Sequence, residues 1–275
     1  PKVTKYDNPN RTLTDPYEGQ QLGEIWGYVV DGYFKTDEEA RNYKVDQSFV
    51  NQMINASALD NGLHAGDLKF VDLDGNNKIE QTTSANDRKD MKVIGNSLPR
   101  YNYNFGISAD WYGIDFSVLF QGIGKQNWYP GAETSMFWGP YSRPYASFIP
   151  SDFMSQVWSE ENTNAYFPRP RGYVALGSNR ELAVVNTKYL QNLAYCRLKN
   201  LSIGYTLPDK WLSKIGFEKI RVYFSGENLL TFTKLHSDYI DPEQASASNS
   251  WKTSKSDANI YPWAKTYSFG VDITF

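Results

Sequence analysis

The sequence predicts an all-β fold of about six antiparallel strands. Several stretches alternate apolar and polar residues, which is the pattern of a strand with two different faces. The alternation is clearest in residues 267–275, where Tyr, Phe, Val, Ile and Phe face one way and Ser, Gly, Asp and Thr the other. No run approaches the roughly 18–20 apolar residues that a membrane helix needs. A strand with one wholly apolar face is typical of a transmembrane β-barrel wall, although a soluble edge strand can carry the same pattern.

The composition excludes several classes of protein. One cysteine, Cys196, excludes an internal disulfide framework and a cysteine-rich metal site. The net charge of -3 gives no basic surface for nucleic acid. Aromatic residues make up 16% of the chain, which suits either the aromatic girdles of a membrane barrel or a carbohydrate-binding surface. Because the chain begins at Pro1, without an initiator methionine or a signal peptide, we expect processed material or a piece of a longer protein.

The N-terminal part of the chain predicts one strand and some helix. Residues 1–21 are polar and turn-rich, which is typical of a connection. Residues 24–34 alternate and form the first expected strand. Residues 36–60 are expected to be helical in part, because Thr36 can cap a first turn that begins with three acidic residues. The apolar residues at helical spacing there are Phe49, Met53 and Ile54.

The remaining strands follow in pairs. Residues 101–111 and 114–121 predict a hairpin whose strands, at roughly ten residues each, suit a tilted membrane strand of about 9–11 residues. The segment 122–188 is long and irregular, with one helix expected around 151–158. Residues 200–207 and 220–227 predict a second pair, and the closing strand ends the chain. The small and polar residues expected to face a lumen are Asn102, Asn104, Ser108, Ser117, Ser202, Thr206 and Asp272.

The connections between these strands alternate between long and short. They cover residues 35–98, 110–113, 125–190, 208–216 and 233–262. Outer-membrane barrels have short turns on the periplasmic side and long loops outside the cell. With Phe275 on the periplasmic side, every long connection would be extracellular. The chain is therefore expected to be a C-terminal segment, of about six antiparallel strands, of a large transmembrane β-barrel with long extracellular loops.

Several motifs together carry a resemblance to a known family. They are residues 27–32, 66–70, 93–96, 197–208, 221–232 and 267–275. In this order they resemble the C-terminal part of SusC/RagA-type TonB-linked outer-membrane transporters of Bacteroidetes. The resemblance covers nearly the whole chain from about residue 20 onward and identifies residues 1–275 as barrel.

The resemblance implies a function, partners and a location. It implies a barrel of about 22 strands closed by a plug domain, which these residues lack together with the rest of the barrel. It implies active import of an oligosaccharide or peptide across the outer membrane, powered by the TonB complex acting on the plug. It also implies a SusD-like surface lipoprotein as partner, and it gives the terminal aromatic Phe275 a role as an assembly signal. No nucleophile, base or carboxylate pair stands out, so we expect no enzymatic activity.

Residues 66–94 form a distinct unit, expected to be an extracellular insertion that resembles a calcium loop. Hard cations take six to eight oxygens, and Asp72, Asp74 and Asn76 present side-chain oxygens at positions 1, 3 and 5 of a turn. The backbone carbonyl of Lys78 would follow at position 7. The resemblance assigns the last acidic ligand to Asp87, with Glu80 as the substitute. Calcium is favoured over magnesium, and a polar turn without metal is the alternative.

Four aromatic residues in the segment 122–188 are candidate substrate contacts. They are Trp128, Tyr129, Trp138 and Tyr141. At the mouth of a barrel their rings could stack on a sugar or a peptide. They could equally pack the long connection on itself or contact a partner. The alternative to a transporter is a soluble β-sandwich that binds carbohydrate and is stabilised by calcium, which would fold completely within these residues.

Overall fold

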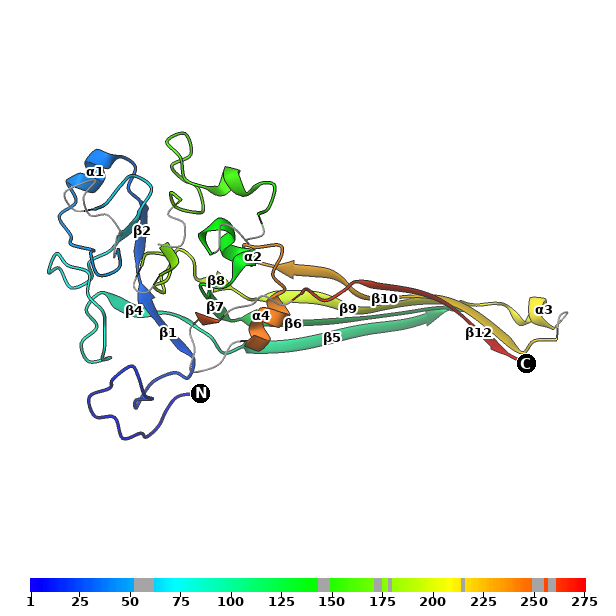
Figure 1. Ribbon diagram of the computed structural model, residues 1–275. Helices are drawn as coiled ribbons and strands as arrows, with labels where there is room; N and C mark the ends of the chain where they lie inside the picture. The colour runs from blue at the N-terminus through cyan, green and yellow to red at the C-terminus, as the bar shows by residue number, and fades with distance from the viewer. Residues whose placement is uncertain are drawn as a thin grey trace.

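The computed structural model describes residues 1–51, 62–142, 149–170, 175–177, 180–213, 216–248, 255–256 and 261–275, with only the backbone described at 247–248 and 255–256. The protein has two parts (Figure 1). A long sheet extends toward the C-terminus. A loop domain, made of the described residues of 1–98, 126–194 and 234–265, lies at the other end of the sheet.

The long sheet has five antiparallel strands in the order β12-β10-β9-β6-β5. Their bounds are Arg100–Trp111 (β5), Ile114–Lys125 (β6), Tyr195–Thr206 (β9), Lys219–Thr233 (β10) and Thr266–Thr274 (β12). Each strand of the long sheet lies beside the strand of this sheet that precedes it in the chain. Two of these pairs are joined by short connections, and the other two by long connections that contain the short strands and helices of the loop domain.

One face of the long sheet is apolar and open. Phe105 stacks on Phe120 of the neighbouring strand with ring centroids 4.9 Å apart, and Phe224 lies 5.2 Å from Phe269. These cross-strand pairs stabilise the sheet locally, but they do not remove the face from solvent. Phe269 is 84% exposed and Val271 is 58% exposed. The alternation predicted for these strands is confirmed, and its apolar side is a surface.

The long connections all lie at one end of the sheet, as predicted. The two-residue turn between β5 and β6 and the short connection that carries α3 (Asp209–Leu212) lie at the far end, near the C-terminus (Figure 1). The described parts of the two long connections, 126–194 and 234–265, lie at the opposite end and make up the loop domain together with the described residues of 1–98. Each strand runs opposite to the strand before it, so successive connections alternate between the two ends of the sheet. Because short and long connections also alternate, the long ones share one end.

The loop domain contains short strands and short helices. Its strands are Glu24–Tyr28 (β1), Val30–Tyr33 (β2), Leu68–Phe70 (β3), Met91–Asn96 (β4), Asn127–Pro130 (β7), Gln191–Asn192 (β8) and Lys255–Ser256 (β11). Its helices are Asp37–Arg41 (α1), Ser135–Trp138 (α2) and Pro242–Ser248 (α4), and its 3-10 turns are Gly139–Tyr141 (η1) and Phe153–Gln156 (η2). Among the described residues no helix is both long and apolar enough to cross a membrane.

The prediction that residues 24–34 form a strand of the long sheet is wrong. This segment is divided into β1, which pairs with β4, and β2, which pairs with β3. Tyr28 bonds through its backbone to Val185 and Thr187 of the loop domain, so the chain changes partners within this segment. Ile25 and Tyr28 are buried there, which leaves no open apolar face of the kind that the long strands have. Within the described residues the long sheet therefore has five strands rather than about six.

The helix predictions are confirmed only in part. The hydroxyl of Thr36 accepts a hydrogen bond of 3.1 Å from the amide of Glu39 and caps α1 as expected. Phe49 packs against the core of the loop domain, whereas Met53 and Ile54 lie outside the described residues. The helix expected around 151–158 is the 3-10 turn η2, which is only four residues long.

The core of the loop domain is aromatic. The ring of Phe137 lies at its centre and packs edge-on against several others, with ring centroids 4.7 Å apart for Trp138 and 5.8 Å for Phe167. Edge-to-face packing of this kind contributes about 0.5–1.5 kcal/mol per pair beyond the burial of the rings. The loop domain is therefore a packed body that the long connections build together.

Candidate functional site: the polar sheet face and the acidic loop

The second face of the long sheet is polar, and one row of side chains crosses it. Asn104 of β5 pairs with Gln121 of β6, Gln121 pairs with Arg197 of β9, and Arg197 pairs with Thr231 of β10. Residues that are paired across antiparallel strands point to the same face. Arg197 reaches this face because the register of β9 shifts between Leu198 and Asn200. Unbroken alternation through β9 would have placed it on the apolar face.

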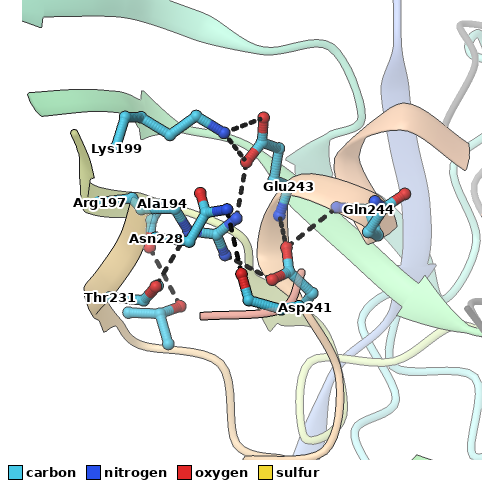
Figure 2. Close-up of polar contacts among 10 residues, drawn as sticks. Ala194, Arg197, Lys199, Asn228, Thr231, Asp241, Glu243 and Gln244 are labelled. Atoms are coloured by element: carbon cyan, nitrogen blue, oxygen red, sulfur yellow. Dashed lines mark hydrogen bonds and ion pairs between the residues drawn. The ribbon is translucent and has the colours of Figure 1, made fainter. Parts of the chain in front are cut away.

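Arg197 is buried on this face and holds a segment of the loop domain (Figure 2). Its guanidinium donates to Thr231 Oγ1 at 3.0 Å, to Glu243 Oε2 at 2.7 Å and to Asp241 Oδ2 at 2.5 Å. Its side chain is 2% exposed. A buried guanidinium stays charged, so two carboxylates that neutralise it are what makes its burial possible. Lys199 Nζ adds a second cation 3.2 Å from the same Glu243 oxygen.

Asp241 also begins the helix that it helps to hold. Its Oδ1 accepts hydrogen bonds from the amides of Glu243 at 2.9 Å and Gln244 at 3.3 Å (Figure 2). Pro242 follows it as the first residue of α4, a position where a missing N–H costs nothing. One carboxylate therefore both caps α4 and pairs with Arg197.

The acidic loop brings three carboxylates together. Oxygens of Asp72, Asp74 and Asp90 all lie within 4.8 Å of one another. Calcium binds oxygens at about 2.3–2.6 Å, so ligands on opposite sides of one ion are separated by about that distance. Asp90 is fully buried, and it accepts hydrogen bonds from the amides of Leu73 at 2.8 Å and Glu80 at 2.7 Å. Burial raises the pKa of Asp90, and the nearby Asp74 and Asp72 carboxylates raise it further.

Hydrogen bonds from backbone amides hold the turn that carries these carboxylates. Asp72 accepts from the amides of Gly75 and Asn77, each at 2.7 Å. Asn77 has a φ of 62°, so it adopts the left-handed conformation that glycine takes at this position of a calcium loop. The same bonds would hold a polar turn without metal. They do not prevent binding of a cation, because each carboxylate oxygen keeps a second lone pair. The donor set therefore fits calcium, with Asp90 as its buried member.

The other residues predicted for the metal site have different positions. Asp87 lies in a separate turn, where its amide bonds to Ser84, and it is not one of the converging carboxylates. The substitute, Glu80, lies within 3.3 Å of Lys89 Nζ. The side-chain oxygen of Asn76 accepts from the amide of Lys78 at 2.7 Å. Sequence reasoning missed Asp90, which lies ten residues after Glu80 and outside the spacing of the turn.

The four aromatic residues predicted to contact a substrate lie inside the core of the loop domain. Trp128, Tyr129 and Trp138 have no exposed surface, and Tyr141 is 2% exposed. The indole N–H of Trp138 donates to the Gly131 carbonyl at 3.0 Å, and burial raises the pKa of Tyr129 well above its ordinary value. A ring without exposed surface does not stack on a ligand. The structure thus favours the alternative that they pack the long connection on itself.

The terminal residue Phe275 lies at the other end of the sheet. It is 81% exposed, and its ring centroid lies 5.2 Å from that of Phe217. This position at the end of the closing strand leaves the terminal ring accessible. Its assembly role stays a prediction.

Comparison with known proteins gives one consistent result. No protein-family model matches the chain. TonB-dependent receptor P3 of Formosa agariphila is 29% identical over 264 residues, which is 94% of this chain and 22% of that protein. TonB-dependent receptor P39 of the same organism is 26% identical over 94% of this chain and 25% of that protein. The resemblance to TonB-dependent receptors is confirmed.

Solved structures extend this likeness to the fold. The RagAB peptide transporter matches 99% of this chain and 24% of its own with a TM-score of 0.56 at 18% identity. The RagAB peptide importer in the closed-closed state matches 99% of this chain and 25% of its own with a TM-score of 0.54 at 22% identity. The receptor-like chain thus spans about a quarter of the length of the proteins it matches.

Proposed function

We propose that this chain forms part of the wall, and part of the loops at one end, of an outer-membrane importer. The observation that carries the proposal is the two-faced sheet, whose long connections all lie at one end. A barrel wall needs an apolar face toward lipid and a polar face toward the lumen. An open edge in lipid would leave backbone groups unpaired, so β5 and β12 would pair with strands from the rest of the barrel.

The activity proposed for the whole assembly is TonB-dependent import of a large nutrient, an oligosaccharide or a peptide. A SusD-like surface lipoprotein and the TonB complex are the proposed partners, with the plug supplied from outside these residues. The likeness to TonB-dependent receptors supports the class of transport. The likeness to the RagAB structures supports the fold alone, so it does not select peptide over oligosaccharide.

For the acidic loop we propose a structural calcium site made by Asp72, Asp74 and Asp90. Asn76 and the Lys78 carbonyl stay in the proposal as neighbouring oxygens, and Asp90 takes the place of Asp87. Calcium would offset the repulsion among three carboxylates and fix the loop at the proposed extracellular end.

The location is tested by fractionation of cells that make the protein. We expect it in the detergent-solubilised outer membrane, and removal of Phe275 should lower the amount inserted if the terminal ring is the assembly signal. Recovery of a soluble monomer from the aqueous fraction would support the calcium-stabilised carbohydrate-binding sandwich instead. The exposed rings of Phe269 and Phe105 argue against that alternative, because a soluble domain rarely leaves such a row uncovered.

A further inference from the structure

We propose that Arg197 is a positioning residue that holds α4 over the polar face of the long sheet and so sets the width of the passage beside it. The inference rests on the proposed function, since it takes the polar face as the wall of a conduit. It concerns size selection within that conduit.

The helix α4 lies against the polar face through the network centred on Arg197 (Figure 2). Residues 241 and 243, which pair with this arginine, come 44 and 46 positions later in the chain. They belong to the long connection between β10 and β12. This connection therefore turns inward over the sheet instead of continuing away from the strand ends.

A groove of about 500 Å³ separates α4 from the wall. Glu243 and Ser246 line it from the side of α4. Asn102, Asn104 and Gln121 line it from the strands. All three side chains are polar, and the sequence assigns Asn102 and Asn104 to the face toward the lumen. Gln121 is paired with Asn104 and therefore lies on the same face. The position of α4 thus decides how much of this face a solute can reach.

Among the described residues, the charge network of Arg197 is accompanied by a small apolar attachment of α4. The helix is seven residues long, and helices this short are not stable by themselves in water. Ala245 is its buried apolar residue, and Ile240, two residues before the helix, is also buried. The charge network is the larger attachment. Without Arg197, the buried Asp241 and the half-buried Glu243 would lose their shared cation, and only Lys199, which pairs with Glu243, would remain.

The chemistry also explains why the residue is arginine. Its planar fork bonds Thr231, Asp241 and Glu243 at the same time, from three different nitrogens. A lysine at this position is one charge on a flexible stem and can satisfy only part of the set. We therefore expect Arg197→Lys to restore part of what Arg197→Met removes.

The test measures how fast cysteines on the polar face react with reagents of two sizes. The protein as it is made in the outer membrane is purified in detergent, with Cys196→Ser as background. Asn104→Cys reports on the groove, and Ser108→Cys, on the same strand and face but outside the groove, is the control. The reagents are a small methanethiosulfonate and a maleimide carried on a protein-sized polyethylene glycol.

At Asn104→Cys we expect the small reagent to react equally fast with and without Arg197→Met. The large reagent should react about tenfold faster with Arg197→Met, which corresponds to about 1.4 kcal/mol of opening free energy, and Arg197→Lys should be intermediate. The rate at Ser108→Cys should not change. An unchanged large-reagent rate at Asn104→Cys would overturn the proposal. Failure of both reagents at Asn104→Cys, with reaction at Phe105→Cys, would instead overturn the proposed orientation of the sheet.

A second measurement covers the case in which Arg197→Met does not insert. In the unmodified protein, hydrogen exchange of peptides over 241–248 is compared with that of peptides over 208–213, which carry α3. Both helices contain a comparable backbone bond, Ala245 to Asp241 at 2.9 Å and Ser213 to Asp209 at 3.0 Å. In the described part of the chain, no arginine side chain forms an ion pair with α3 as Arg197 does with α4. We expect exchange in α4 to be at least about tenfold slower. Equal exchange would overturn the proposal.

Discussion

The guanidinium of Arg221 on β10 reaches Asp115 on β6 across the whole width of β9. Its nitrogens lie 2.6 and 2.8 Å from the two carboxylate oxygens. The strand between them places Gly204 directly beneath the side chain, and a β-carbon there would lie 2.2 Å from Asp115 Oδ2 and 2.6 Å from Arg221 Nε. Glycine at this position therefore allows a cation on one strand to bond an anion two strands away. Asp272 of β12 accepts from the same guanidinium at 3.1 Å, so one side chain joins three strands of the polar face.

The first prediction concerns this crossing. Gly204→Ala should displace Arg221 from Asp115 and destabilise the long sheet by about 1–3 kcal/mol, the usual cost of overpacking a filled site. Thermal unfolding of the protein in detergent measures the change. Ser202→Ala, on the same strand and face, adds no bulk and is the control. A melting temperature of Gly204→Ala equal to that of the control would show that the crossing does not matter for stability.

The second prediction tests which face meets lipid. Ser268 and Phe269 are consecutive residues of β12 and point to opposite faces, where they pair with Ser225 and Phe224. Phe269→Arg should lower the amount of inserted protein, because an arginine facing lipid costs about 2–4 kcal/mol at the membrane centre. Ser268→Arg should insert far better, since its side chain would face water. Outer-membrane yields of the two variants, compared at equal expression, give the answer, and equal yields would contradict the assignment of faces.

The two faces could be predicted from the sequence because a strand has a period of two, and that period is visible within each segment. The loop domain could not be predicted in this way. Trp128 and Trp138 look like surface aromatics in their local sequence, yet their neighbours come from distant segments, such as Tyr189, whose ring centroid lies 5.1 Å from that of Trp138. Burial of this kind depends on contacts between residues far apart in the sequence, and local spacing carries no sign of it.

The acidic loop shows the same limit at a single residue. The turn at Asp72 and Asp74 is local, and its spacing identifies both carboxylates as candidate ligands. Asp90 joins them only because the chain returns and its carboxylate bonds the amides of Leu73 and Glu80. The segment 24–34 is a third case. Its alternation of apolar and polar residues is real, but its two halves, β1 and β2, pair with other segments of the loop domain.

The third prediction distinguishes Asp90 from Asp87 as a calcium ligand. Calorimetric titration of the protein with calcium chloride should show binding that Asp72→Asn and Asp90→Asn each weaken at least about tenfold, because each removes a charged ligand. Asp87→Asn, a matched change of an exposed carboxylate, should bind as the parent does. Calcium at about 100 times its Kd should also stabilise the parent by about 2.7 kcal/mol. Loss of binding in Asp87→Asn alone would return the ligand to Asp87, and absence of binding in the parent would leave a polar turn without metal.

The fourth prediction is a pH dependence that originates at His236. Its ring stacks on Tyr166 with centroids 3.4 Å apart, and its Nε2 lies 2.9 Å from Gln156 Oε1. Gln156 donates its amide to Asp152 at 2.8 Å, so its carbonyl oxygen faces the histidine and accepts the Nε2 proton. Loss of water around the stacked ring lowers the pKa of His236 below its ordinary value of 6.5.

The sign of the effect follows from this shift. Below pH 6.5 the unfolded chain binds a proton at His236, whereas the folded protein binds it only at a lower pH. The contribution of His236 to the free energy of unfolding is therefore complete above pH 6.5 and is lost as the pH falls. The melting temperature should therefore drop between pH 7.5 and 5.5 by more in the parent than in His236→Phe, which keeps a ring on Tyr166 but cannot titrate. Thermal unfolding of both proteins at the two pH values measures this difference. An equal drop in both would place the origin of any acid sensitivity at other residues.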